Sequence, residues 1–116
     1  YLQTSNMKEL DTIEEFNDFL NDNPGKLVVI DFFATWCGPC QFIGPYVEQL
    51  AEADKLKGKA VFAKVDVDKN DDASAEYGVE AMPTFMLFLN GSKVDSVRGA
   101  DIRKLITKIE TQISKL

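Results

Sequence analysis

The two cysteines of this 116-residue chain stand two residues apart, in the segment ATWCGPC at residues 34–40. A Cys-x-x-Cys pair can be half of a zinc site, a structural crosslink or a redox couple. A structural zinc site takes four protein ligands, usually cysteine or histidine, and this chain has no histidine and no third cysteine. Zinc binding would therefore need carboxylates or a second chain to complete the ligand set.

A crosslink between Cys37 and Cys40 would contribute little stability. In the chain-entropy description the stabilisation grows with the logarithm of loop length. A loop this short gives about 2 kcal/mol at most, against about 4.7 kcal/mol for a loop of about a hundred residues. The spacing therefore favours a redox couple, with the structural crosslink as the alternative.

The redox interpretation rests on the position of the pair in the chain. Cys37 follows a predicted buried strand and opens a predicted helix, whose unpaired N–H groups and dipole favour a thiolate. Pro39 is tolerated in the first helical turn because its missing N–H would be unpaired anyway. Cys40 returns to the same helix face and can reach Cys37. We predict that Cys37 is the exposed nucleophile and Cys40 the buried resolving thiol, whose tethering contributes more to the rate than the acidity of Cys37 does.

Strand and helix patterns alternate along the chain and must position this pair. The run LVVIDFF at residues 27–33 is apolar and rich in β-branched residues, as is typical of a strand buried on both faces. Thr12 opens a helix with a capping box, Asp101 caps another helix, and Asn90-Gly91 is a hairpin signal. The elements predicted in chain order are a short strand at 7–10, a helix at 12–20, a strand at 27–33, a helix from 39 to about 56 that Pro45 should kink, a strand at 59–68, a helix at 71–78, two strands within 84–99 and a helix after residue 101.

This alternation predicts an α/β fold with a parallel core, crossover helices and a closing antiparallel hairpin. The sheet should be mixed, with helices on both faces. By its length the chain is expected to form one domain. Residues 1–6 precede Met7, which looks like an initiator, and we expect them to be a short extension left by processing or by expression.

Composition and charge argue against several classes of function. The chain has 19 acidic and 13 basic residues and a formal net charge of −6, whereas nucleic acids and anionic membranes attract clustered positive charge. The longest apolar stretch, residues 81–89, is broken by Pro83 and Thr84 and is shorter than the about 20 residues of a membrane-spanning helix. No secretory signal pattern opens the sequence. Two cysteines are too few for a disulfide framework, which favours a reducing compartment.

The segments VVIDFFATWCGPC at 28–40, AMPTF at 81–85 and RGAD at 98–101 are similar, at matching spacing, to those of the thioredoxin family, and their style resembles its eukaryotic members. The resemblance covers residues 7–116. It implies the thioredoxin fold, a central mixed five-stranded sheet flanked by four helices. It also implies a protein-disulfide reductase, because Gly-Pro between the cysteines resembles the reducing members, whereas protein disulfide isomerases usually carry Gly-His.

The resemblance implies where the electrons come from and where they go. No cofactor would be bound: the redox-active disulfide Cys37–Cys40 would be recharged by thioredoxin reductase, and NADPH would act only through that enzyme. The expected substrates are protein disulfides, such as those of peroxiredoxins or ribonucleotide reductase. We expect a cytoplasmic monomer that binds no metal, nucleic acid or membrane, with an organelle or leaderless secretion as alternatives.

Two charged residues are further candidates for the site. Asp31 stands in the middle of an apolar strand, where an isolated charge is costly, so burial should raise its pKa and mark it as a functional candidate. A satisfied structural carboxylate is the alternative. The resemblance implies that Asp31 relays the proton of Cys40 and that Lys64 lies near Asp31 and tunes its charge. For Lys64 the alternative is a solvated lysine at a strand end.

The resemblance also implies a substrate-binding surface around the cysteines. Pro83 would follow a cis peptide bond beside the disulfide, and the backbone of Met82 would pair with an extended substrate segment. Trp36 is expected to form a contact platform, and Arg98 adds positive charge at the rim. Four phenylalanines are assigned to the core: Phe32, Phe33, Phe85 and Phe88. The predicted surface comprises Trp36, Gly38, Pro39, Val67, Ala81, Met82, Pro83, Gly99 and Ala100.

Two other functions stay open on the sequence alone. The same cysteines could serve a thiol oxidase or isomerase, which an equilibrium with glutathione would distinguish from a reductase. The chain could also be a thioredoxin-fold binding subunit of a larger assembly, in which case replacing both cysteines with serine would leave its function intact.

Overall fold

The computed structural model describes residues 7–116, and its elements follow the predicted order. The extension expected at residues 1–6 lies outside the described residues. The strands are β1 (Lys8–Glu9), β2 (Leu27–Phe33), β3 (Ala60–Asp66), β4 (Thr84–Leu89) and β5 (Ser92–Arg98), and the helices are α1 (Ile13–Asn21), α2 (Gly38–Ala51), α3 (Asp71–Glu76) and α4 (Ile102–Ile113).

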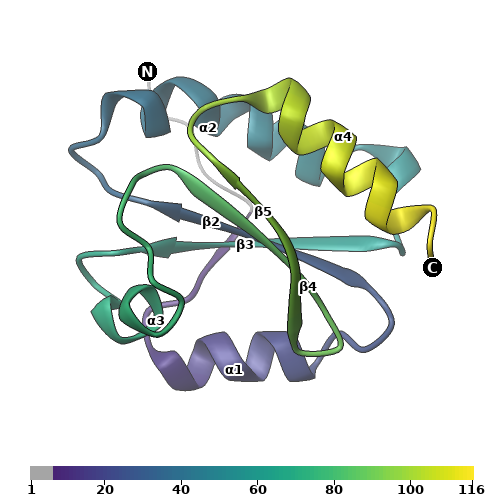
Figure 1. Ribbon diagram of the computed structural model, residues 1–116, viewed down its shortest axis with the longest axis horizontal. Coiled ribbons are helices and arrows are strands. Elements are labelled where there is room, and N and C mark those ends of the chain that lie inside the picture. The colour runs from purple at the N-terminus through teal and green to yellow at the C-terminus, as the bar shows by residue number, and fades with distance from the viewer. Residues whose placement is uncertain (1–6) are drawn as a thin grey trace.

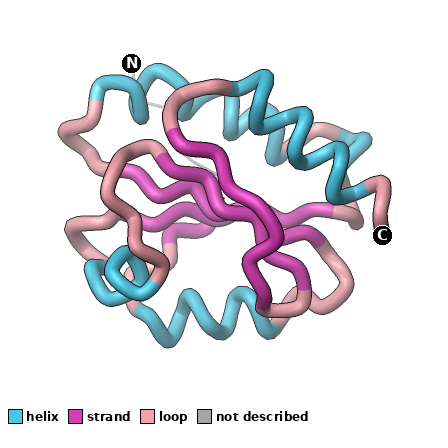
Figure 2. The backbone as a smooth tube through the Cα atoms, in the orientation of Figure 1, coloured by secondary structure: helices cyan, strands magenta, loops and turns pink. Residues whose placement is uncertain are grey.

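The five strands form one mixed sheet in the order β1-β3-β2-β4-β5. Strand β2 pairs parallel with β3 and antiparallel with β4, and β5 closes an antiparallel hairpin with β4. Helices α1 and α3 cover one face of the sheet, and α2 and α4 cover the other (Figure 1). Figure 2 shows the strands between these two pairs of helices. The predicted mixed five-stranded sheet flanked by four helices is therefore confirmed.

Strand β2 lies at the centre of the sheet and contributes to both cores. Leu27 and Val29 pack with buried residues of α2 and α4, whereas Val28 and Ile30 pack with those of α1 and α3. Successive side chains of a strand point to opposite faces of the sheet. By the same alternation, Asp31 falls on the face covered by α2, and this places a buried carboxyl group beneath the helix that carries the cysteines.

The predicted helix caps form. The Oγ1 atom of Thr12 accepts a hydrogen bond from the backbone N–H of Glu15 at 3.1 Å, and the carboxylate of Asp101 accepts one from Lys104 N–H at 3.0 Å. Each bond satisfies an N–H that has no partner inside its helix. These local contacts fix where α1 and α4 begin.

Two predictions are wrong, one about where a helix ends and one about the burial of Phe33. The helix expected from residue 39 to about 56 ends at Ala51, because Ala53 is extended and a separate 3₁₀ turn at Asp54–Leu56 carries Leu56 into the core. Phe33 was expected in the core but is only partly buried, since it stands at the end of β2 and packs beside the cysteines.

Within residues 7–116, every helix is too short or too polar to cross a membrane. This agrees with the broken apolar stretch noted in the sequence.

Candidate active site

Cys37 and Cys40 form a disulfide at the start of α2, with their Cα atoms 5.3 Å apart. Cys37 is the N-cap of the helix, and its Sγ accepts a hydrogen bond from the backbone N–H of Cys40 at 3.2 Å. Pro39 stands in the first turn, where the helix makes no use of an N–H. The sequence WCGPC thus places one sulfur against an unpaired N–H at the positive end of a helix, where negative charge is stabilised.

The expected difference in exposure between the two cysteines is wrong for this disulfide form. Cys37 is 6% exposed and Cys40 is 7% exposed, so both are buried. Phe33, Val67 and Met82 pack against the pair. The two sulfurs therefore differ in their surroundings and not in their burial: Cys37 caps the helix, whereas Cys40 lies one turn inside it.

The residues predicted for the substrate surface differ in their exposure and in whether they contact the cysteines. Val67 and Met82 are partly buried and touch the cysteine cluster. Trp36 is 68% exposed, and Gly38, Pro39 and Ala100 are exposed, as is Arg98 at the end of β5. Ala81 and Gly99 are half-buried, while Pro83 is buried and cannot itself offer side-chain surface to a partner.

The segment at residues 81–84 brings a carbonyl oxygen to the first sulfur. The Met82–Pro83 peptide bond is cis, and the carbonyl oxygen of Met82 lies 3.5 Å from Cys37 Sγ. Gly99 N–H donates to the Pro83 carbonyl at 2.8 Å, and the Thr84 hydroxyl donates to the Ala81 carbonyl at 2.6 Å. This network connects the loop after β5 to the loop before β4 beside the disulfide.

Asp31 is buried beneath the start of α2. Only 7% of it is exposed, and its Oδ1 is the buried side-chain atom without a hydrogen-bond partner among the described residues. Burial raises the pKa of Asp31 from 3.8 to about 7; Lys64 opposes this rise and Glu48 adds to it. Such a carboxyl group can change its protonation state near neutral pH, as a proton carrier must.

Lys64 stands beside Asp31 in the sheet. The two residues are register partners across the parallel pair β2–β3. The Nζ atom of Lys64 lies over the ring of Phe33, 5.5 Å from its centroid, which is a cation–π arrangement. Lys64 is thus partly buried against the site and is not a freely solvated lysine.

Asp31, Lys64 and Cys40 line one cavity of about 480 Å³. A cavity of this size has room for several water molecules. Residues that the sequence analysis missed also line it, chiefly Glu48 and Gly44. Its chemically relevant lining comprises Asp31, Cys40, Gln41, Gly44, Glu48 and Lys64.

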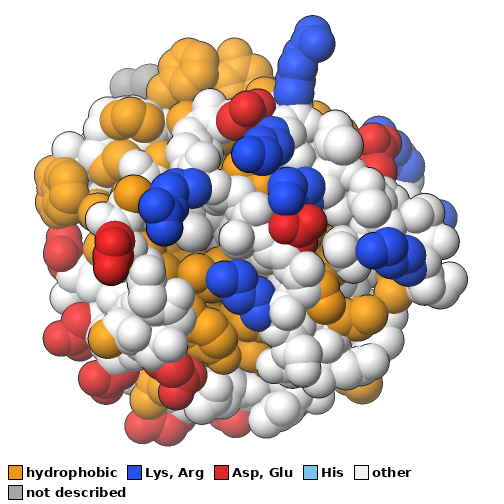
Figure 3. Space-filling model, in the orientation of Figure 1, with side chains coloured by type: hydrophobic (Ala, Val, Ile, Leu, Met, Phe, Trp, Pro, Cys, Tyr) orange, Lys and Arg blue, Asp and Glu red, His pale blue; other side chains and the backbone are white. Residues whose placement is uncertain are grey.

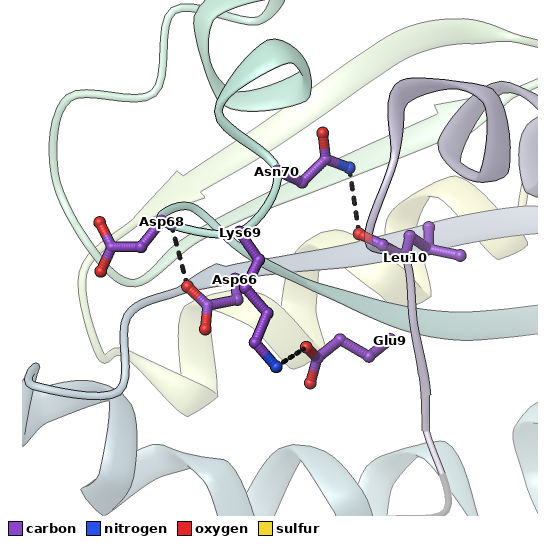
Figure 4. Close-up of polar contacts among 6 residues, drawn as sticks. All are labelled: Glu9, Leu10, Asp66, Asp68, Lys69 and Asn70. Atoms are coloured by element: carbon purple, nitrogen blue, oxygen red, sulfur yellow. Dashed lines mark hydrogen bonds and ion pairs between the residues drawn. The ribbon is translucent and has the colours of Figure 1, made fainter.

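Asp68 is a further residue that sequence reasoning missed. The indole N–H of Trp36 donates to Asp68 Oδ2 at 2.8 Å. The loop that carries Asp68 is fixed in turn: Asp68 N–H donates to Asp66 Oδ1 at 2.9 Å, and the Asn70 amide donates to the Leu10 carbonyl at 3.0 Å (Figure 4). The repeated aspartates of the segment VDVD, at the end of a strand, were the available signal.

Replacing Asp68 with alanine should free the indole of Trp36. Trp36 is the only tryptophan of the chain, so time-resolved fluorescence anisotropy should report faster local motion in Asp68→Ala. Because Trp36 is exposed and water can replace the lost acceptor, the free energy of unfolding should change by no more than about 1 kcal/mol. Asp72→Ala, in the first turn of α3, is the charge-matched control. An unchanged Trp36 anisotropy decay in Asp68→Ala would contradict the positioning role.

The surface of the molecule has exposed aromatic side chains on α2 and separate acidic and basic regions. Phe42 is 68% and Tyr46 48% exposed on α2, with their ring centroids 5.9 Å apart. Figure 3 shows acidic side chains along the lower left edge, where Figure 1 places α3 and α1, and basic side chains over the α4 side.

In residues 7–116, no three potential metal ligands of the His, Cys, Asp or Glu type cluster together.

Comparison with known proteins gives consistent matches over nearly the whole chain. The sequence model of the Thioredoxin family matches residues 7–111. Thioredoxin-1 of Schizosaccharomyces pombe is 42% identical over 107 residues, which make up 92% of this chain and 99% of that protein. Thioredoxin of Equus caballus is 43% identical over 104 residues, 90% of this chain and 96% of the relative. The X-ray structure of Fasciola hepatica thioredoxin matches with a TM-score of 0.85 and 47% identity, covering 90% of this chain and 98% of that one.

Proposed function

This chain belongs to the thioredoxin family, whose members are disulfide oxidoreductases, and we propose that it exchanges electrons with protein disulfides through the sulfur of Cys37. The protein is a protein-disulfide reductase that works by dithiol–disulfide exchange. The observation that carries this function is the Cys37–Cys40 disulfide at the N-terminus of α2. Trp36, Gly38 and Pro39, exposed beside it, give a partner surface to bind.

In the first step, the thiolate of reduced Cys37 attacks one sulfur of the substrate disulfide. A bond forms between Cys37 Sγ and that sulfur, the substrate disulfide breaks, and the second substrate sulfur leaves as a thiolate that takes up a proton. The N-cap position supports Cys37 in this role, because the Cys40 N–H and the helix N-terminus stabilise a negative sulfur. The carbonyl of Met82, 3.5 Å from that sulfur, is placed to accept a backbone N–H of the substrate.

In the second step, Cys40 resolves the mixed disulfide. Its thiol gives its proton to the carboxylate of Asp31, and the resulting thiolate attacks Cys37 Sγ. The Cys37–Cys40 disulfide forms and the substrate leaves as its second thiolate. Asp31 and Cys40 line the same cavity, which supports proton transfer between them directly or through water. Lys64, the register partner of Asp31, favours the ionised carboxylate that must accept the proton.

The substrate surface follows from the same arrangement. Trp36, Gly38 and Pro39 would contact the partner on one side of the disulfide, and Ala81, Met82, Gly99 and Ala100 on the other, with Val67 between them. Pro83 would act by holding Met82 and not by direct contact, because it is buried. The exposed rings of Trp36 and Phe42 favour a partner segment with apolar side chains.

The partners follow from the family. Thioredoxin reductase would pass two electrons from NADPH to the oxidised pair, which takes up two protons, one derived from NADPH and one from solvent. Protein disulfides such as those of peroxiredoxins or ribonucleotide reductase would then receive the electrons. We propose that the protein works as a monomer in the cytoplasm, where thiols are kept reduced.

An insulin-reduction assay with thioredoxin reductase and NADPH tests the function. The protein should sustain continuous NADPH oxidation with insulin present, and a protein with both cysteines replaced by serine should not. Equilibration with glutathione separates a reductase from an oxidase, because a reductase pair stays oxidised in millimolar glutathione. Ready reduction of the pair by glutathione, without turnover in the insulin assay, would overturn the proposal.

A further inference from the structure

Three residues of α2 form a row that faces the sheet. Cys40, Gly44 and Glu48 are spaced four apart, and residues four apart lie on the same face of a helix. All three line the cavity that also contains Asp31 and Lys64. Two turns of helix thus extend from the resolving thiol, past a position without a side chain, to a carboxylate.

The opposite wall of this cavity is the sheet. Asp31 on β2 and Lys64 on β3 stand side by side in register. Only 7% of the surface of Asp31 is exposed, and its Oδ1 has no hydrogen-bond partner among the described residues. Glu48 is half-buried and so is placed between this interior and the solvent.

We propose that Glu48 is a positioning residue of the proton-transfer site: its carboxylate shares the cavity with Asp31 and, by its negative charge, opposes Lys64 in setting how readily Asp31 accepts the proton of Cys40. The proposal rests on the proposed role of Asp31. It adds a second carboxylate and assigns it a function.

The charges around Asp31 support this role. Lys64 on β3 and Glu48 on α2 are the charged groups that act on Asp31, and they act in opposite directions. A negative neighbour disfavours the ionised form of a carboxyl group, so Glu48 raises the pKa of Asp31 and makes its carboxylate a stronger base. A stronger base takes the proton of Cys40 more completely. The thiol of reduced Cys40 also lines this cavity.

Gly44 keeps the row open between Cys40 and Glu48. A Cβ atom at Gly44 would meet no heavy atom within 4 Å, so this position borders free space. Asp31, Gly44 and Glu48 line the same cavity, so the two carboxyl groups can act on each other across it. In such a partly buried site, charges interact more strongly than in bulk water.

Glu48→Gln tests the proposal because it removes the charge and keeps the shape. The titration of the Asp31 carboxyl carbon is followed by ¹³C NMR in the reduced protein. We expect the midpoint of Asp31 to move to lower pH in Glu48→Gln and to higher pH in Lys64→Gln. Glu52→Gln removes the same charge four residues further on, at the C-cap of α2, and should leave the midpoint in place. The conservative variant Glu48→Asp should restore most of the parent midpoint.

A kinetic measurement separates this proposal from the one on which it rests. The reduced parent protein, Asp31→Asn and Glu48→Gln are each mixed rapidly with a substrate disulfide, and resolution of the mixed disulfide that forms is timed against pH. We expect Asp31→Asn to slow resolution, and Glu48→Gln to shift the pH profile to lower pH. If Asp31→Asn resolves as fast as the parent, the proton-acceptor role of Asp31 is wrong. If Asp31→Asn is slow but Glu48→Gln leaves the Asp31 midpoint and the pH profile where they were, only the role of Glu48 is overturned.

Discussion

Replacing Cys37 with serine should reduce insulin reduction to the background rate. A serine hydroxyl is not ionised at neutral pH and does not attack a disulfide, so no mixed disulfide forms. Cys40 keeps its thiol in this variant but lies inside the first helical turn, without the N-cap position that stabilises a negative sulfur at Cys37. Steady-state NADPH consumption with thioredoxin reductase and insulin measures the loss.

Replacing Cys40 with serine should stop turnover at a different point. Cys37 can still attack, so one substrate equivalent is bound as a mixed disulfide and then stays bound. The tethered thiol acts at an effective concentration of about 10⁵ M or more, which free thiols at millimolar levels cannot replace. A rapid release of one substrate thiol per protein, followed by no further turnover, is the expected result. A mixed disulfide trapped on Cys40 in Cys37→Ser, with no attack by Cys40→Ser, would show that the roles of the two cysteines are reversed.

Replacing Asp31 with asparagine should stabilise the oxidised protein at neutral and alkaline pH. Burial raises the pKa of Asp31 from 3.8 to about 7. Between these values the unfolded chain has lost the proton and the folded protein still holds it, so stability falls as the pH rises. A tenfold difference in proton affinity corresponds to about 1.4 kcal/mol, so the loss approaches about 4 kcal/mol above pH 7.

The effect of Asp31→Asn should therefore depend on pH in a defined direction. The amide does not titrate, so the gain in unfolding free energy should be largest near pH 8 and small near pH 4. Urea unfolding of the oxidised proteins at several pH values measures it. An equal effect at pH 4 and pH 8 would contradict a buried carboxyl group with a raised pKa.

Asp95 provides a control of opposite sign. Its carboxylate accepts a hydrogen bond from Lys108 Nζ at 2.7 Å, and this bond lowers the pKa of Asp95. A lowered pKa contributes stability above the ordinary value that is lost as the pH falls through the folded value. Asp95→Asn should thus destabilise the protein at neutral pH, with an effect that fades in acid.

Elements with strong local signals could be predicted from the sequence. The run at 27–33 became β2 with the same bounds, and the caps at Thr12 and Asp101 mark the starts of α1 and α4. The turn at Asn90-Gly91 joins β4 and β5, and both residues have positive φ, as a tight hairpin requires. In each case neighbouring residues determine the conformation, so a short window of sequence contains the necessary information.

Features that depend on distant segments could not be predicted in the same way. The burial of Cys37 comes from Val67 and Met82, which follow it by many residues and meet it only in the folded sheet. Helix α2 ends at Ala51, and the 3₁₀ turn that follows packs Leu56 into the core against residues that are distant in the sequence. The spacing of Glu48 from Cys40 could have identified it as a residue of the same helix face. Only the folded structure shows that this face lines a cavity with Asp31 and its strand partner Lys64.

The proposed mechanism depends on which sulfur bonds to the substrate first. Reduced Cys40→Ser and Cys37→Ser proteins are each mixed with a substrate disulfide, quenched in acid, digested and mapped by mass spectrometry. We expect a substrate adduct on Cys37 in the Cys40→Ser protein, formed much faster than any adduct on Cys40 in the Cys37→Ser protein. Adducts forming at equal rates, or faster on Cys40, would contradict it.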